Sequence, residues 1–260
     1  MAARRPSLLL ATGAVGLACG ACTVAPRADT ASATTAGPAD AAQFVAGDPV
    51  PTQRTLAARD FLPAEGMEAR FEVLRDGRPV ARESERVESQ GGLLVYVRER
   101  DGRTDERLHL RSDADGALWL ALVETPPESM RSLFAEALPF APAKLVPGIP
   151  CEGRSPMEVR TVPQDKVRAR GTGSRSLSIT GECEVQHRGV TRRAVIAEFR
   201  FEAALDAARA EVRSELFIVP GMGVIAERRR EKRVILGILG TTRDEVAVLV
   251  DTVPAPAGAR

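Results

Sequence analysis

The side chains best suited to chemistry are few in this chain of 260 residues, and they are far apart in the sequence. The chain has two histidines, His109 and His187, and four cysteines, of which Cys151 and Cys183 lie in the body of the chain. Two histidines are too few for a multi-histidine metal cage, so we expect neither a metal nor a cofactor. A nucleophilic pair of Cys183 and His187 is disfavoured, because about 13 Å separates residues four apart along an extended strand. That distance is too long for proton transfer.

Cys151 and Cys183 are better explained by a disulfide. An even pair of cysteines predicts a bond in an exported protein, and the N-terminal sequence described below indicates export. Cys183 shares its parity with Leu177, Ile179 and Val185, so it should face the buried side of a strand. The bond would close a loop of about 31 residues and stabilise the fold by about 3–4 kcal/mol. The alternative is two separate thiols.

Other segments with the look of functional loops lack the residues that such loops need. Residues 171–174, Gly-Thr-Gly-Ser, have neither the third glycine of a dinucleotide loop nor the lysine of a phosphate loop, and they predict a hairpin or a bulge. Residues 113–116, Asp-Ala-Asp-Gly, lack the flanking carboxylates of a calcium loop and predict a turn. With no catalytic constellation, we expect a non-enzymatic protein. Dispersed carboxylates such as Glu68, Glu72 and Glu198 leave an envelope hydrolase as an alternative.

The charged residues are numerous but balanced. Lys and Arg total 36 and Asp and Glu total 35, a formal net charge of +1, so the basic excess of a general nucleic-acid binder is absent. The densest basic run is Arg228–Arg230 with Arg233, interleaved with Glu227 and Glu231. This pattern predicts a solvated strand face with paired charges, and contact with anionic lipid head groups is the alternative. In general, we expect alternating Arg and Glu on the outward faces of strands.

The N-terminus has the architecture of a secretory signal peptide at residues 1–18. Two arginines precede an apolar stretch from Ser7 to Ala18, which is too short to span a bilayer comfortably. The cysteine that follows resembles the lipobox of bacterial lipoproteins, a family in which this cysteine is diacylated and begins the mature protein. Cys19, after a Leu-Ala pair, is the favoured lipidation site, and Cys22, after a Gly-Ala pair, is the alternative.

This N-terminus predicts both a cellular location and a domain organisation. Two acyl chains anchor a protein stably where one is marginal. We therefore expect a lipid-anchored protein of the bacterial cell envelope that faces the periplasm, at the outer membrane in preference to the inner one. A soluble secreted protein is the alternative. Residues 19–55 are rich in Ala, Thr, Pro, Gly and Ser and predict a disordered tether. Residues 56–251 predict a single β-rich domain, and residues 252–260 a disordered tail.

Strands must position any site that the domain contains. Met67, Ala69, Phe71 and Val73 alternate with charged residues, which is the period-two pattern of a strand with one buried face. Similar runs recur at a spacing near a dozen residues, separated by Asp-Gly or Gly-Gly pairs that favour hairpins. They resume near Met157, beyond a proline-rich crossover. The fold class predicted is mainly β, a curved antiparallel sheet or half-barrel meander.

One helix is expected among these strands, near residues 126–138. Residues 125–128, Thr-Pro-Pro-Glu, have the spacing of a capping box, with proline at the first helical position. Apolar residues that include Met130, Phe134 and Leu138 then follow at helical spacing, and a proline ends the run. We predict that this amphipathic helix packs on the sheet.

A family resemblance rests on the meander, on residues 145–148 (Leu-Val-Pro-Gly) in the crossover, and on residues 219–227 (Val-Pro-Gly-Met-Gly-Val-Ile-Ala-Glu). Over residues 60–251 the chain resembles uncharacterised bacterial envelope proteins, whose curved half-barrel is similar to that of lipoprotein-carrier proteins. Carrier proteins bury acyl chains there, so the resemblance implies a curved sheet that could bind a lipid or an envelope partner protein. It implies no catalytic residue. We therefore predict a membrane-anchored, non-enzymatic envelope lipoprotein, with a purely structural or assembly module of the envelope as a further alternative.

Overall fold

The computed structural model describes residues 44–235 and 239–256. The predicted signal peptide at 1–18 and the candidate lipidation sites Cys19 and Cys22 lie outside the described residues. Three short elements accompany the long strands: β1 (Phe44–Ala46) and the 3-10 turns η1 (Ala58–Phe61) and η2 (Pro126–Glu128).

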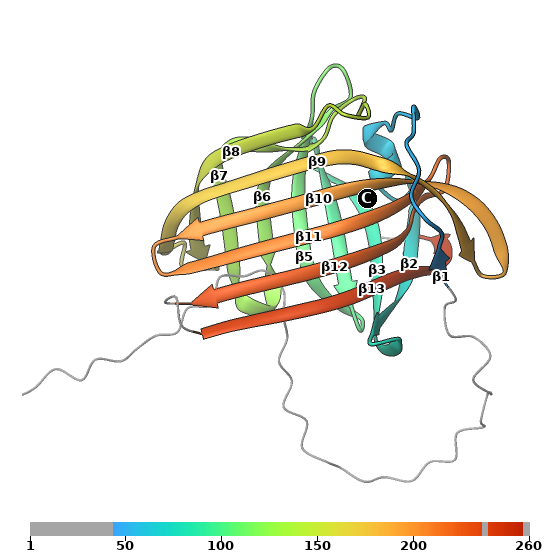
Figure 1. The fold of residues 1–260 in the computed structure, drawn as a ribbon. Helices are drawn as coiled ribbons and strands as arrows, with labels where there is room; N and C mark the ends of the chain where they lie inside the picture. Colours follow the sequence, from blue (N-terminus) through green and yellow to red (C-terminus); the bar gives the residue numbers. More distant parts are fainter. Residues whose placement is uncertain (1–43, 236–238, 257–260) are drawn as a thin grey trace, which may run out of the picture.

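Twelve long antiparallel strands follow one another around a closed barrel (Figure 1). Each strand pairs with the next one along the chain, and the last, β13, pairs with the first, β2, in a register that sets Leu249 opposite Phe71. The strands are β2 (Met67–Arg75), β3 (Arg78–Gln90), β4 (Leu93–Arg100), β5 (Arg103–Ser112), β6 (Leu118–Thr125), β7 (Met130–Ala141), β8 (Cys151–Thr161), β9 (Val167–His187), β10 (Val190–Leu205), β11 (Ala208–Val219), β12 (Gly223–Ile235) and β13 (Leu239–Pro254).

The prediction of a half-barrel is therefore wrong, because the sheet closes on itself. The prediction of a mainly β fold is confirmed. Closure depends on the β13–β2 pairing, which joins residues about 180 positions apart, as in Val246 opposite Leu74. Local patterns report which residues alternate along one strand, but they contain no signal for pairing between the two ends of a meander. A closed barrel leaves its twelve strands without the open edges that a half-barrel exposes.

The predicted helix near residues 126–138 is also wrong. A single 3-10 turn, η2, occupies the proline pair, Ser129 then takes the left-handed conformation (φ 51°), and β7 begins at Met130. The apolar residues Met130, Phe134 and Leu138 are four apart, a spacing that places them on one face of a helix and equally on one face of a strand. Pairing of β7 with β6 and β8 decides between the two.

The glycines at 171 and 173 lie inside β9, so the hairpin or bulge predicted for residues 171–174 is not formed there. A Cβ on Gly171 would lie 2.0 Å from the carbonyl oxygen of Ala204, and one on Gly173 would lie 2.8 Å from the ring of Phe134. These glycines therefore allow a close approach of strands and rings. By contrast, residues 113–116 form the predicted turn, in which the Asp113 carboxylate accepts a hydrogen bond from the backbone of Ala117.

The end of the β9–β10 hairpin extends beyond the barrel wall and curves over it (Figure 1). At this end β9 pairs with β1, which sets Phe44 opposite His187. The His187 ring nitrogen Nε2 lies 2.6 Å from the carbonyl oxygen of Leu249 in β13. Residues 44–55, the described part of the segment expected to be a tether, thus include a strand paired with β9, and β13 runs to Pro254, beyond the boundary expected at residue 251.

Two apolar clusters form the core. The larger lies inside the barrel and includes Leu56 and Phe61 from the segment before β2, which is tied by two backbone hydrogen bonds between Leu56 and Leu145. The smaller gathers the curved end of the β9–β10 hairpin, β1 and parts of β2 and β11–β13. In it the ring of Phe44 meets that of Phe217 edge-on, with centroids 4.9 Å apart. Burial of these faces drives closure of the barrel.

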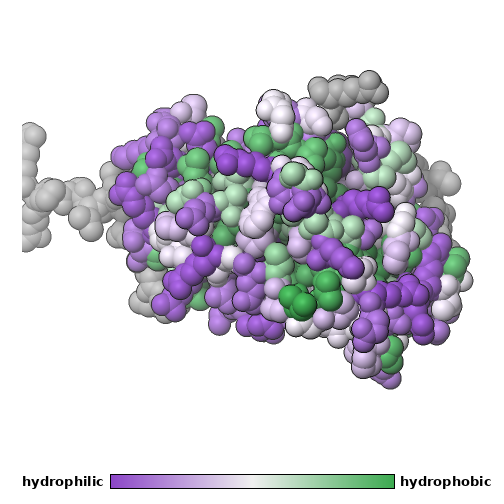
Figure 2. All heavy atoms as spheres, turned by 90° about the horizontal axis from the view of Figure 1, so that it is seen from above, coloured by the Kyte–Doolittle hydropathy of each residue, from purple (hydrophilic) through white to green (hydrophobic). Residues whose placement is uncertain are grey.

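Outward-facing strand residues are largely charged. Figure 2 shows hydrophilic side chains spread over much of the face seen from above, with hydrophobic ones in smaller groups between them. Along β10 and β11 the predicted alternation is confirmed: Phe201 is buried, and the outward Glu198 pairs with Arg200. The outer face thus suits contact with water over most of its area.

Candidate binding site inside the barrel

A cavity of about 150 Å³ remains between the inward-facing side chains. Its apolar wall is built from η1 and from strands between β5 and β11, because alternate residues of each strand point inward. The inward-facing Phe199, Val212 and Leu216 stay partly exposed, so the core does not fill this part of the barrel. The residues of this apolar wall include Phe61, Leu108, Leu120, Val123, Phe140, Leu177, Phe199, Phe201, Val212 and Leu216.

Charged residues form the opposite side of the interior. Strands β3 and β4 set Glu83 opposite Arg100 and Glu85 opposite Arg98, so that opposite charges are cross-strand neighbours. Arg100 Nη1 lies 3.0 Å from Glu83 Oε1, and Arg98 Nε lies 3.1 Å from Glu85 Oε1. The interior charge network, as we name it, consists of Glu83, Glu85, Arg98, Arg100, Glu106, Glu227, Arg229 and Glu245.

Strands β12 and β13 complete this network. Arg229 Nη2 lies 2.6 Å from Glu227 Oε2 and 3.6 Å from Glu83 Oε2. Arg100 Nη2 lies 3.0 Å from Glu245 Oε1. Each arginine of the network therefore contacts at least two carboxylates, which offsets part of the cost of removing so many charges from water.

Burial and pairing shift the pKa values of the network carboxyls in opposite directions. Burial raises the pKa of Glu85 and of Glu106, although the charge of Arg98 opposes the shift. Burial also acts on Glu227, but the charges of Arg229 and Arg98 outweigh it and lower its pKa to about 2. Carboxyls with separated pKa values occur in acid–base sites, and ion-pair networks without catalytic roles produce the same separation.

Among the described residues, Arg175 is the one cation on the apolar side of the cavity. It lies on β9 opposite the inward-facing Phe201 and is 9% exposed. Its guanidinium carbon is 4.3 Å from the ring centroid of Phe140 and 4.5 Å from that of Phe199. The Nε and Nη1 atoms have no hydrogen-bond partner within the described ranges. Burial lowers the pKa of Arg175 to about 9, so the group is still charged at pH 7.

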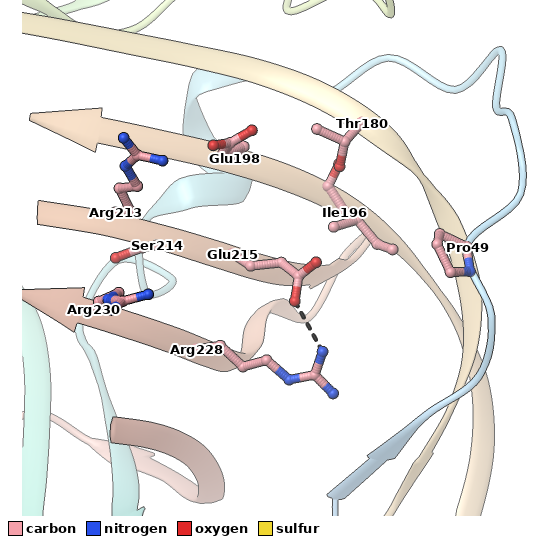
Figure 3. Close-up of a pocket in the computed structure, with 9 residues that line it drawn as sticks. All are labelled: Pro49, Thr180, Ile196, Glu198, Arg213, Ser214, Glu215, Arg228 and Arg230. Atoms are coloured by element: carbon pink, nitrogen blue, oxygen red, sulfur yellow. Dashed lines mark hydrogen bonds and ion pairs between the residues drawn. The ribbon is translucent and has the colours of Figure 1, made fainter. Parts of the chain in front are cut away.

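A second hollow, of about 420 Å³, lies on the outer face of β9–β12 beside Pro49. Figure 3 shows its charged side chains spread along the outside of β10, β11 and β12, with Glu215 and Arg228 directed toward one another at 3.0 Å. The other lining charges are also paired, as in Arg230 with Asp244 at 3.5 Å. Because its charges are satisfied by neighbours and its lining faces water, this hollow is a weaker candidate than the barrel interior.

The predicted disulfide between Cys151 and Cys183 is absent, and both are free thiols. Cys151 is set opposite Leu177 on β9, six residues before Cys183. Six residues span about 20 Å of extended strand, whereas the Cα atoms of a disulfide lie within about 7 Å. The expectation that Cys183 is buried is confirmed, because it is 2% exposed. It lies in the smaller core cluster, however, beyond a register shift in β9 opposite Ile196 and Ala197, and not beside Cys151.

The carboxylates considered for a hydrolase do not meet. Glu68 and Glu72 alternate with the inward-facing Phe71 on β2 and therefore point outward. Glu198 is also on the outer face, where Arg200 pairs with it at 2.6 Å. No acid–base pair is formed by these three residues.

The basic run at 228–230 is divided between the two faces of the barrel wall. Arg228 pairs with Glu215 on the outside, as the solvated-face prediction expected, but Arg229 points inward and its side chain is 10% exposed. Arg233 Nη1 lies 3.5 Å from Glu128 Oε1, and both side chains are 16% exposed. The prediction that alternating Arg and Glu lie on outward faces is therefore wrong for β3, β4 and part of β12, whose charges enter the interior.

The sequence reasoning missed Arg175. The signal was present, since Arg175 shares parity with Leu177 and Ile179 and thus interrupts an apolar strand face with a cation. Over residues 44–235 and 239–256, no group of three or more His, Cys, Asp or Glu residues could hold a metal ion. Nor does any helix in those ranges have the length and apolar character needed to cross a membrane.

Comparisons with known proteins give one structural likeness. No family model matches the chain, and no curated protein matches it. Among solved structures, it is similar to a Bacteroides fragilis protein described as a presumed exported protein with a YmcC-like fold, at 9% identity and a TM-score of 0.41. The likeness covers 74% of this chain and 98% of that one. This degree of likeness assigns neither a fold family nor a function to the chain.

Proposed function

We propose that this chain is a non-enzymatic envelope protein that binds a small, largely apolar ligand inside its barrel. The observation that carries the proposal is the cavity of about 150 Å³, walled by Phe140, Phe199 and Phe201, in a barrel whose remaining apolar interior is packed. Cavities of about this size, lined by Leu, Ile and Phe, hold a benzene molecule in other proteins. A concave apolar wall is the usual form of a small-molecule site, and here the charged groups lie mostly on the other side of the cavity.

The location proposed is the periplasmic side of the bacterial outer membrane. A signal peptide at residues 1–18 followed by Cys19 or Cys22 supports a lipid anchor. The balanced charge supports the absence of a nucleic-acid partner. Labelling of cells with an alkyne fatty acid tests the anchor: the full chain should take up the label, the Cys19→Ser variant should lose it, and Cys22→Ser should retain it. An unlabelled full chain found in the medium would instead identify a soluble secreted protein.

Ligand binding is tested with a neutral probe of the right size. Benzyl alcohol should bind the full chain, detected by saturation-transfer NMR, and native mass spectrometry after mild extraction should reveal a bound small molecule. The Val212→Phe variant, which fills the inner wall, should weaken probe binding at least tenfold. Val190→Phe adds the same atoms at an exposed position of the β9–β10 hairpin and should have no effect. If neither the probe nor any co-purifying molecule binds, the barrel is a structural or assembly module.

A hydrolase is a second candidate, favoured by one observation. Glu85 with a raised pKa and Glu227 with a lowered pKa both line the same cavity, which is the separation that a proton donor and a base require. Screening the folded chain against ester and glycoside substrates tests this candidate. Turnover that Glu85→Gln abolishes, with the fold retained by circular dichroism, would replace the binding function with an enzymatic one.

A further inference from the structure

We propose that Arg175 makes the barrel cavity selective for organic monoanions, specifically carboxylates whose apolar body is about the size of a benzene ring. This inference rests on the proposed binding function and adds the charge and size class of the ligand. It depends on three features of the site: the unsatisfied donors of Arg175, the stacked rings beside it, and the pairing of all nearby network charges.

The donors of Arg175 are positioned for a ligand. Rings stacked on a guanidinium contact its flat faces and leave its N–H groups, which lie in the plane, free to donate. Phe140 and Phe199 lie 4.3 Å and 4.5 Å from the guanidinium carbon, at stacking distance. Nε and Nη1 are both buried without a hydrogen-bond partner inside the described ranges. A buried donor without an acceptor is unfavourable, and a bound carboxylate would supply a charged acceptor to Nε or to Nη1.

Other arginines hold two of the carboxylates that line the same cavity, Glu106 and Glu227. No ion pair joins Arg175 to a carboxylate of the described residues. Glu106 pairs instead with Arg98 of the interior charge network, whose Nη1 lies 3.8 Å from Glu106 Oε2. Glu227 is held by Arg229 at 2.6 Å. An uncompensated cation in an apolar wall stabilises an incoming negative charge strongly, because little water is present to screen it.

The same surroundings limit the ligand to one negative charge and to a small body. Glu85, Glu106 and Glu227 line the other side of the cavity, so a second negative charge on the ligand would be repelled. Phe201 and Leu177 bound the space beside Arg175, and a cavity of about 150 Å³ holds a ring or a short chain of comparable size. A long acyl chain would not fit without expansion of the barrel.

The test compares three probes of similar shape on the full chain at pH 7, by isothermal titration calorimetry. Benzoate should bind about 10- to 100-fold more tightly than benzyl alcohol, the range expected of charge-assisted hydrogen bonds. Phenyl phosphate, which carries more negative charge, should bind more weakly than benzoate. Arg175→Met should remove the preference for benzoate and leave benzyl alcohol binding within threefold.

The matched control is Arg168→Met, which removes an exposed arginine from the same strand and should leave all three affinities unchanged. Arg175→Lys keeps the charge and should retain part of the preference for benzoate. If benzyl alcohol binds but benzoate binds no more tightly, or if Arg175→Met binds benzoate as well as the unchanged chain does, Arg175 has only a structural role and the inference fails. If no probe binds to any variant, the proposed binding function fails with it.

Discussion

The interior charge network should make one buried carboxylate a measurable determinant of stability. We consider the substitution Glu227→Gln, which removes a negative charge from beside Arg229 and Arg98 with little change in shape. The pKa of Glu227 falls from an ordinary value of 4.5 to about 2 in the folded state. At about 1.4 kcal/mol per pKa unit, this difference corresponds to about 3 kcal/mol of free energy of unfolding at pH 7.

The dependence on pH follows from linkage. A carboxyl whose pKa is lowered by folding contributes its full stabilisation above the unfolded-state pKa, here 4.5, and loses it as the pH falls toward about 2. The difference in free energy of unfolding between the unchanged chain and Glu227→Gln should therefore be about 3 kcal/mol at pH 7 and close to zero at pH 2. Comparison of the two proteins at each pH removes the contribution of the other titrating groups.

Urea denaturation followed by far-ultraviolet circular dichroism measures this difference. The matched control is Glu215→Gln, because Glu215 pairs with Arg228 at 3.0 Å on the outer face, where their side chains are 40% and 49% exposed. Its loss should cost less than about 1 kcal/mol. A Glu227→Gln variant that loses no more stability than this control, or one whose deficit is the same at pH 7 and pH 2, would refute the assignment of Glu227 to a buried, paired position.

Three further predictions concern packing and the thiols. Leu138→Ala should lower the free energy of unfolding by about 2–5 kcal/mol, because its side chain is 1% exposed inside the larger core cluster; a loss below about 1 kcal/mol in urea titrations would contradict its place there. Gly171→Ala should lower the melting temperature, because its Cβ would lie 2.0 Å from the backbone of β10, whereas Gly240→Ala meets its neighbours only at 3.5 Å and should be tolerated. Peptide mapping without reductant should find Cys151 and Cys183 unlinked, with Cys183 the slower to react with maleimide because it is more deeply buried; a linked peptide would overturn the described register of β8 with β9.

Much of the local structure is encoded in short segments. The alternation of buried and charged residues predicts β2, β10 and β11, because the side-chain period of a strand is a property of the strand alone. The Asp-Gly pairs likewise predict their turns, and at the first of them Asp76 and Gly77 both adopt positive φ, as a two-residue hairpin of this kind requires. These features do not depend on which strands are neighbours.

The site and the closure of the sheet depend on neighbours. The apolar residues Met130 and Phe134 suit one face of a helix or of a strand, and only pairing with β6 and β8 selects the strand. A run of alternating Arg and Glu has the same sequence pattern whether its charged side chains point to the outside of the barrel or into its interior. Contacts between distant strands place Arg229 against Glu83 inside the barrel and leave Arg175 between two phenylalanine rings. The sequence therefore determined the strands and turns. The tertiary structure decided that the barrel closes, that residues 130–141 form a strand and not a helix, and that the cavity is charged, because each of these depends on contacts between segments far apart in the chain.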